Sequence, residues 1–445
     1  MMRYELRRIV SLLAGVVVMI GVGSLYAISA WNAQLKDLLH YSQAGIATVS
    51  SMAMFGSYLS YFPGIVFDRL GPYKSIVIAG GGLLSVHWLM STALTQYPTY
   101  VSPLLMGFSL ILVGLLSSFC IFASIVPNEG IFGETNRGKV MALLTSSYSC
   151  GGAMFAFVYH RGFDNNVPGY FMFLGVFLLS VCAFGWLAFQ RNKSQRRDSE
   201  IVDANAGTVL TGDRAHDMQE DNDVTGMALL TDARFWLLFL AILITIGACL
   251  FVMSNVSFIV ESLGGPMDQV PLMVASFSMS NTIARLVTGA VSDHFLHQYP
   301  RALFAGISVI LTALTLTTFL TIPVSALIVP VTMAGISEGV MFGTFPVIIR
   351  EAFGLKHFGK NYGLISFANC IGYPFLFSPV SSYFYQQSSS TMGMNGATTT
   401  TTDKCFGAQC FRPVFLLAIA LCGVALVCCF KLILIQNRIK YQAIP

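Results

Sequence analysis

A glutamate and an arginine stand in stretches of sequence that are otherwise apolar enough to cross a membrane. Glu338 is the only charged residue of 324–348, and Arg285 is the only one of 270–291. An ionisable group at the bilayer centre costs roughly 2.5 to 3.5 kcal/mol, so each calls for a partner or a function. A carboxylic acid whose surroundings alternate between wet and dry can exchange a proton. Glu338 is therefore a candidate for proton coupling or substrate contact, and the alternative is a structural hydrogen bond to a neighbouring helix.

Arg285 suggests the binding of an anion. A guanidinium can hold a carboxylate by two parallel hydrogen bonds. Arg285 lies about two helical turns before Asp293. Because arginine is long, it could instead reach toward the cytoplasm, or it could pair with Glu338 or Asp293. Both readings stay open at this point.

Other polar residues inside apolar segments are weaker candidates. His87 could relay protons, although a packed histidine bonded to a neighbour is the simpler interpretation. Five more residues are candidate cavity residues, with interhelical hydrogen bonding as the alternative: Tyr26, Asn32, Asn255, Asn281 and Asn369.

The stretch GIVFDRLGPYK at 64–74 gathers charges between two glycines. Asp68 ends a predicted helix, where the helix dipole disfavours a carboxylate, so we expect it to contact the positive end of another helix. Gly64 would allow close approach of that helix, and Gly71 would allow a positive φ. A cytoplasmic loop rich in basic residues is the simpler alternative, and it leaves Asp68 and the glycine spacing unexplained.

The composition places all of these residues in a membrane. The chain has 445 residues, of which 55% are hydrophobic and 10% charged, with a mean hydropathy of +0.69. A helix needs about 20 apolar residues to cross the hydrocarbon core. We predict an all-α integral membrane protein with twelve spans, near 9–31, 44–66, 75–96, 104–126, 140–159, 169–189, 235–257, 270–291, 303–321, 324–348, 364–385 and 413–434.

The basic residues predict the orientation. With both termini in the cytoplasm, the inner segments hold 20 Lys and Arg and the outer segments hold 4. Basic residues near span ends stay on the cytoplasmic side. This rule also accounts for the net charge of +4, so no nucleic-acid partner is expected.

Cys405 and Cys410 fall in the last outer loop, where a disulfide and two free thiols are equally expected.

The segments divide into two halves. Residues 190–232 carry no membrane-length apolar run, so we interpret them as a cytoplasmic linker between six-helix halves at 1–189 and 233–445. A plain tether is the simpler role for this linker, and a regulatory role is the alternative. GIVFD at 64–68 matches GAVSD at 289–293, which pairs Gly64 with Gly289 and Asp68 with Asp293. Further matches at nearly the same offset indicate an internal duplication, as in many transporter folds.

A family resemblance follows from these motifs. GIVFDRLGPYK resembles the loop signature of the major facilitator superfamily, G-x-x-x-D-R-x-G-R-R/K, from which Pro72 and Tyr73 depart. The resemblance implies that spans 2 and 11 meet at the cytoplasmic face, that span 10 lines the cavity and that span 3, with His87, is peripheral. It implies a cytoplasmic gate made by Gly64, Asp68, Arg69, Gly71, Lys74, Gly289 and Asp293.

A narrower resemblance covers most of the chain. The blocks at 25–43, 232–240, 261–266, 281–295 and 350–363 resemble the nodulin-like branch of this superfamily, which is similar to oxalate-formate antiporters and monocarboxylate carriers. The implied function is a secondary active transporter of a small organic solute, such as a monocarboxylate, coupled to protons by alternating access. The alternative is a transporter-like receptor that binds solute without net transport.

The sequence also indicates what this protein lacks. No H-E-x-x-H motif and no G-x-x-x-x-G-K-[ST] loop occurs, so we expect no enzyme, no metal and no cofactor. The expected partners are the solute, protons and the lipid bilayer, and we expect a functional monomer. The predicted location is multi-pass in the plasma membrane or an organelle membrane, with both termini cytoplasmic.

Overall fold

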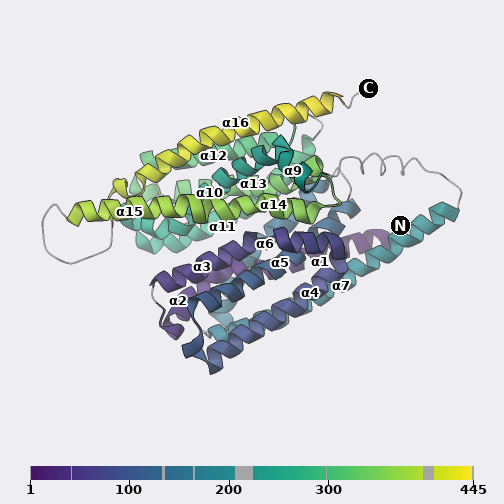
Figure 1. Cartoon of the computed structure of the whole chain (residues 1–445), viewed down its shortest axis with the longest axis horizontal. Coiled ribbons are helices and arrows are strands. Elements are labelled where there is room, and N and C mark those ends of the chain that lie inside the picture. Colours follow the sequence, from purple (N-terminus) through teal and green to yellow (C-terminus); the bar gives the residue numbers. More distant parts are fainter. Residues whose placement is uncertain are drawn as a thin grey trace. The chain divides into compact units, whose positions relative to one another are not determined.

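The computed structural model describes residues 2–41, 43–132, 136–163, 166–205, 224–296, 298–393 and 405–442. Within these ranges every regular element is a helix (Figure 1). Eleven helical segments there are long and apolar enough to cross a membrane. The predicted all-α membrane architecture is confirmed.

One of these eleven segments, Thr48–Gln96, contains two spans. Its 49 residues would extend about 74 Å as a single helix, more than twice the thickness of the hydrocarbon core. Gly71 interrupts it with φ 73° and ψ 175°. Division at Gly71 gives twelve spans, which is the predicted number.

The chain forms two compact units, which are described separately. Unit 1 consists of Met1–Thr231 together with Pro346–Phe367. Its elements before residue 232 are α1 (Met2–Val22), η1 (Gly23–Ala27), α2 (Ile28–Leu39), α3 (Gln43–Tyr58), α4 (Tyr61–Gln96), η2 (Pro98–Tyr100), α5 (Pro103–Phe132), α6 (Arg137–Gly162), α7 (Val167–Asn205) and α9 (Met227–Thr231).

Unit 2 consists of Asp232–Phe345 and Ala368–Pro445, so that α13 and α14 each contribute to both units. The elements after residue 232 are α10 (Ala233–Ser262), η4 (Met267–Gln269), α11 (Val270–His294), α12 (Ala302–Thr321), η5 (Val324–Ala326), α13 (Ile328–Phe353), α14 (Phe358–Ile371), the π-helix η6 (Gly372–Phe377), α15 (Ser378–Gly393), η7 (Ala408–Cys410) and α16 (Arg412–Gln442).

Glycines set the helix contacts inside each unit, because a helix without side chains at the contact can approach its neighbour closely. In unit 1, a Cβ on Gly151 of α6 would lie 2.2 Å from the carbonyl oxygen of Ile20 in α1. In unit 2, a Cβ on Gly372 would lie 2.4 Å from the carbonyl oxygen of Leu243 in α10. Gly151 and Gly372 align with each other in the internal duplication, so corresponding glycines make the same kind of contact in both units.

The predicted linker at 190–232 is partly helical. The helix α7 continues beyond the predicted end of span 6 at residue 189 as far as Asn205. The last part of the linker forms the short helix α9. Residues 206–223 lie outside the described residues. The domain boundaries themselves stay a prediction.

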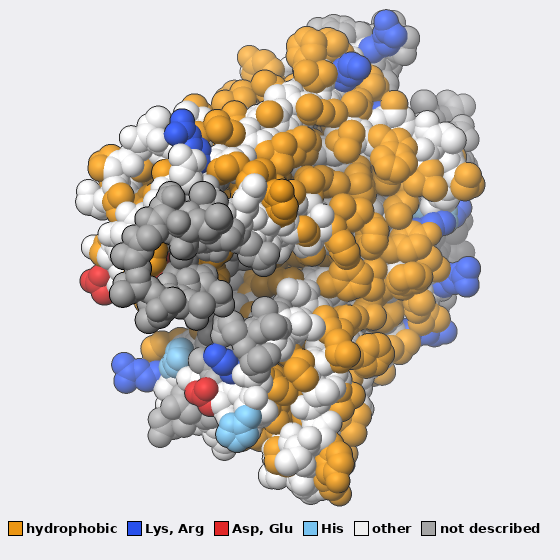
Figure 2. Space-filling view, turned by 60° about the vertical axis from the view of Figure 1, so that its left-hand side comes forward, with side chains coloured by type: hydrophobic (Ala, Val, Ile, Leu, Met, Phe, Trp, Pro, Cys, Tyr) orange, Lys and Arg blue, Asp and Glu red, His pale blue; other side chains and the backbone are white. Residues whose placement is uncertain are grey.

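The surface suits a hydrocarbon environment. Figure 2 shows hydrophobic side chains spread over a wide area, with few Lys, Arg, Asp or Glu side chains. Large apolar side chains such as Leu89, Phe430 and Trp88 are 70%, 61% and 57% exposed. In water such a surface would be unfavourable, whereas lipid chains cover it at no cost.

Candidate functional site

A glycine stripe on α13 brings the two central charged residues together. A Cβ on Gly339 would lie 2.4 Å from the carbonyl oxygen of Asn281 in α11, and one on Gly343 would lie 3.0 Å from that of Arg285. The predicted packing of this stripe against a neighbouring helix is confirmed. Because α11 and α13 are in backbone contact, Glu338 lies beside Asn281 and Arg285.

Asn281 connects Arg285 to Glu338. The Arg285 Nε donates a hydrogen bond to Asn281 Oδ1 at 2.7 Å. The Asn281 side chain also hydrogen-bonds Glu338, which interacts electrostatically with Arg285. Since Oδ1 already accepts from Arg285, the amide nitrogen of Asn281 is the donor to Glu338. We refer to Arg285, Asn281 and Glu338 as the polar triad.

The polar triad is buried and only partly satisfied. Glu338, Asn281 and Arg285 are 3%, 5% and 3% exposed. The guanidinium of Arg285 lies over the ring of Phe342, 4.2 Å from its centroid, in a cation–π contact. Glu338 Oε2 is buried and has no hydrogen-bond partner among the described residues. A buried polar oxygen without a partner costs about 1 to 3 kcal/mol, so this atom is a candidate contact point for a proton or a solute.

Hydroxyl groups fix the helix that carries Glu338. Ser308 Oγ of α12 donates to the Ser337 carbonyl oxygen at 2.7 Å, and Ser337 Oγ donates to the Ser308 carbonyl oxygen at 2.8 Å. Thr312 Oγ1 lies 2.5 Å from Ser337 Oγ. These reciprocal bonds hold α13 against α12 immediately next to Glu338. These residues were not predicted from the sequence, because serine and threonine are common in membrane helices.

The two remaining asparagines predicted for this site differ from each other. Asn255 Nδ2 donates to the carbonyl oxygen of Phe251 in its own helix, at 3.0 Å. Asn369 is 1% exposed, and neither Nδ2 nor Oδ1 has a hydrogen-bond partner among the described residues. Asn369 is therefore the better candidate for a solute or water contact in unit 2.

The polar candidates of unit 1 form local pairs. The hydroxyls of Tyr26 and Tyr58 lie 3.0 Å apart, and Asn32 Nδ2 donates to Ser50 Oγ at 2.7 Å. His87 Nδ1 lies 2.8 Å from the carbonyl oxygen of Leu83 in its own helix. The environment of His87 is consistent with the packed-histidine interpretation.

Asp68 contacts the amino end of α14. Its Oδ1 accepts from the backbone N–H of Gly359 at 3.0 Å, and its Oδ2 accepts from that of Lys360 at 2.9 Å. These N–H groups belong to the first turn of α14, where no intrahelical acceptor exists and the helix dipole is positive. The contact expected for Asp68 is present, and its role as a gate stays a prediction.

The glycines beside Asp68 allow this contact. A Cβ on Gly64 would lie 2.2 Å from the carbonyl oxygen of Gly359, and Gly71 has the predicted positive φ. Asp68 lies in the connection between the spans at 44–66 and 75–96. Burial raises the pKa of the Asp68 carboxyl to about 6, although its two backbone hydrogen bonds and the charge of Lys360 act in the opposite direction. Arg69 is exposed, and Lys74 lines a surface groove.

The second predicted gate aspartate has a different partner. Asp293 Oδ1 accepts from Arg301 Nη2 at 2.7 Å, and the Arg301 Nη1 donates to Ser292 Oγ at 2.7 Å. Both side chains of the ion pair are 1% exposed. Gly289 accepts through its carbonyl oxygen from Ser292 Oγ at 3.1 Å. Arg301 was not among the predicted site residues, although it is the only Lys or Arg between the predicted spans 8 and 9.

A charge cluster that joins α5, α6 and α13 was also missed. Arg137 Nε of α6 donates to Glu129 Oε1 of α5 at 2.6 Å, and Arg350 Nε of α13 lies 3.4 Å from the same oxygen. Glu351 Oε1 lies 3.8 Å from Arg137 Nη1. In the prediction of the orientation, these arginines were used only as basic residues that stay on the cytoplasmic side. The rarity of charge in this chain was the signal that could have found the cluster.

The end of the predicted linker contacts α14 as well. Val224 N donates to the carbonyl oxygen of Phe353 at 3.3 Å. The Nδ2 of the buried Asn361 donates to the Val224 carbonyl oxygen at 2.8 Å. A tether needs no such contacts, so the linker terminus helps to hold the first turn of α14.

In the last predicted outer loop, Cys405 and Cys410 form a disulfide. The loop is tied down by Cys405 N, which donates to Tyr385 Oη at 3.0 Å, and by Gly407 N, which donates to the carbonyl oxygen of Ser262 at 2.6 Å. Of the two expectations for these cysteines, the structure has the disulfide.

Known proteins with similar sequence and structure define the class. The family model of the Major Facilitator Superfamily matches residues 11–375 and 238–441, and the chain belongs to this family of membrane transporters. It is 22% identical to the "Probable transporter mch1" of Aspergillus fumigatus, with 92% of this chain and 83% of that protein covered. It is 23% identical to the "Uncharacterized MFS-type transporter YhjX" of Escherichia coli, with 83% and 86% covered.

A solved structure shares the fold. The proton:xylose symporter XylE, bound to 6-bromo-6-deoxy-D-glucose, superposes with a TM-score of 0.70 over 96% of each chain. The sequences are 13% identical, so this likeness concerns the fold alone.

Proposed function

We propose that this protein is a secondary active transporter of the nodulin-like branch that carries a small organic anion, such as a monocarboxylate, together with a proton by alternating access. The observation that carries the proposal is the buried polar triad of Arg285, Asn281 and Glu338. It provides one cation and one proton-exchanging acid in direct connection.

The charge of the triad explains how the two cargoes would be coupled. With Glu338 ionised, its charge balances that of Arg285, and the triad is neutral. Protonation of Glu338 leaves a net charge of +1 in a buried site, which favours an anion. Loss of the proton restores the balance and favours release of the anion. Proton and anion would therefore bind together and leave together.

The energetics favour this pairing. Moving one charge across 100 mV costs or yields about 2.3 kcal/mol. A monocarboxylate and a proton carry no net charge together, so the membrane potential does not oppose their joint movement. The proton gradient alone would then drive accumulation.

Other features support a transport cycle. The unpartnered amide of Asn369 offers a donor and an acceptor to a polar solute. The contact of Asp68 with the amino end of α14 could act as the cytoplasmic gate, since it joins two helices through hydrogen bonds that can break. XylE is a proton symporter, and the relative in Aspergillus fumigatus is named a probable transporter, which agrees with the proposal.

Uptake into proteoliposomes tests the proposal. A mixed panel of monocarboxylates, dicarboxylates and amino acids is supplied under an inward proton gradient, and accumulated solutes are identified by mass spectrometry. Accumulation of an anion that needs the gradient is expected for the wild type. In Glu338→Gln the dependence on the gradient should disappear, whereas Glu261→Gln, a control at the outer end of α10, should behave as the wild type.

The same experiment separates the alternatives. Arg285→Met should abolish anion uptake, because the cation is lost. Equal gradient-driven uptake by wild type and Glu338→Gln would refute the proton role of Glu338. Saturable binding of an anion without net flux would favour the receptor interpretation.

A further inference from the structure

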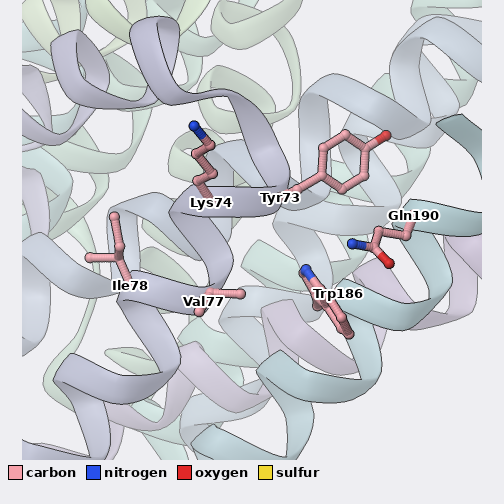
Figure 3. A pocket seen from close by; sticks show the side chains of 6 residues that line it. All are labelled: Tyr73, Lys74, Val77, Ile78, Trp186 and Gln190. Carbon is pink, nitrogen blue, oxygen red and sulfur yellow. The ribbon is translucent and has the colours of Figure 1, made fainter.

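A groove opens on the surface between α4 and α7, separate from the polar triad. It has a volume of about 530 Å³ and is lined by Tyr73, Lys74, Val77 and Ile78 of α4 and by Trp186 and Gln190 of α7 (Figure 3). All six residues belong to unit 1. Lys74 follows the Gly71 turn, and Gln190 lies at the predicted end of span 6. The groove is therefore at the end of both helices that the basic residues predict to be cytoplasmic.

The floor of the groove is apolar and open to the membrane. Val77 and Ile78 are 55% and 45% exposed, although they belong to a segment apolar enough to span the bilayer. Such side chains face lipid tails. The floor therefore suits an acyl chain, and a soluble anion would gain nothing from it.

The rim carries polar groups that the protein leaves unused. Lys74, the Trp186 indole N–H and the Gln190 amide make no hydrogen bond or ion pair with the described residues, and no carboxylate lines the groove. In Figure 3 Trp186 and Gln190 lie next to each other on α7, whereas the Lys74 ammonium points away from them. The sequence continues after Gln190 with RNKSQRR, which adds four basic residues within seven.

We propose that this groove binds one anionic phospholipid of the cytoplasmic leaflet. An acyl chain lies along Val77 and Ile78, and the headgroup phosphate accepts hydrogen bonds from Trp186 and Gln190. Lys74, whose flexible side chain can turn toward the headgroup, supplies the positive charge. Aromatic residues favour the interfacial depth of the bilayer, and each basic residue near an anionic membrane surface contributes about 1 kcal/mol. The positive charge and the absence of a lining carboxylate select an anionic headgroup over a zwitterionic one.

A lipid in this groove would also act on the neighbouring connection. Tyr73 and Lys74 lie two and three residues after Gly71, in the same turn that carries Asp68. Because the headgroup holds Lys74, it restrains this connection and with it the contact between Asp68 and α14.

Native mass spectrometry of the whole protein, released from mixed micelles, tests the assignment. The probes are phosphatidylserine and phosphatidylcholine with identical acyl chains. The wild type should bind the first phosphatidylserine more tightly than the first phosphatidylcholine. Lys74→Gln should weaken the binding of the first phosphatidylserine about fivefold, the equivalent of about 1 kcal/mol. It should leave the affinity for phosphatidylcholine unchanged.

Two further variants keep the result decisive. Lys431→Gln removes an exposed lysine of α16, which lines no part of the groove, and should bind phosphatidylserine as the wild type does. Ile78→Trp fills the floor of the groove without changing the charge, and it should weaken the binding of the first phosphatidylserine and of the first phosphatidylcholine alike. If Lys74→Gln and Lys431→Gln lose the same amount of phosphatidylserine affinity, the attraction is a general property of the surface charge, and the proposal is overturned. So would displacement of the lipid by soluble glycerophosphoserine, because the acyl chain would then contribute nothing.

Discussion

Replacement of Gly64 by alanine should break the contact between Asp68 and α14. The new Cβ would lie 2.2 Å from the carbonyl oxygen and 2.4 Å from the carbonyl carbon of Gly359, and ordinary contact begins at 3.4 Å. Both atoms are backbone and cannot rotate away, so the helices must separate by about 1.2 Å, the difference between 3.4 and 2.2 Å. The two hydrogen bonds of Asp68, at 3.0 and 2.9 Å, would then exceed 3.5 Å and be lost.

The structure gives the size of this effect. A hydrogen bond to a charged group contributes about 1.5 to 3 kcal/mol. Water competes for the half-buried Asp68, so we take the lower value for each bond, which gives about 3 kcal/mol for the pair. At about 1.4 kcal/mol per factor of ten, the contact should open on the order of 100 times more often.

Hydrogen–deuterium exchange measures this opening directly. The backbone N–H groups of Gly359 and Lys360 lie in the first turn of α14, where Asp68 is their acceptor. Their exchange should accelerate by the same factor in Gly64→Ala. Gly81→Ala makes the same change beyond the Gly71 kink, in the next span, at a site where the new Cβ would meet no atom within 4 Å. Unchanged exchange in Gly64→Ala, or equal acceleration in both variants, would refute the reasoning.

Three other predictions concern the remaining polar contacts. Arg301→Met should destabilise the protein by roughly 3 to 5 kcal/mol, because it leaves the buried Asp293 without its cation, and adding Asp293→Asn should recover part of the thermal stability. Burial raises the pKa of Asp68 to about 6 from about 3.9 in water. The conformation in which Asp68 contacts α14 therefore binds the proton more tightly than the open conformation, and it gains stability as the pH falls from 6 to 4. Exchange of the two α14 amides, corrected for intrinsic rates, should therefore slow between pH 7 and pH 5, and Asp68→Asn should abolish this dependence. Cys405→Ser with Cys410→Ser should lower the thermal midpoint, since closing this short loop contributes roughly 2 kcal/mol, and a reducing agent should then have no further effect.

The sequence by itself determined the class of fold and much of the contact at Asp68. Twenty-residue apolar runs specify membrane helices through their length and hydropathy alone, and this information is local. The spacing of Gly64, Asp68 and Gly71 was equally informative. A glycine, a carboxylate at a helix end and a glycine with positive φ each have few structural explanations.

Only the tertiary structure decided which charged groups meet. Arg285 and Glu338 are 53 residues apart, and their connection through Asn281 depends on the register in which the α13 glycines pack on α11. Asp68 and Asp293 match in sequence, yet one contacts a helix end and the other contacts Arg301. Hydropathy carries no information on such pairings, because a charge is satisfied by whichever opposite group the folded backbone brings within hydrogen-bond distance.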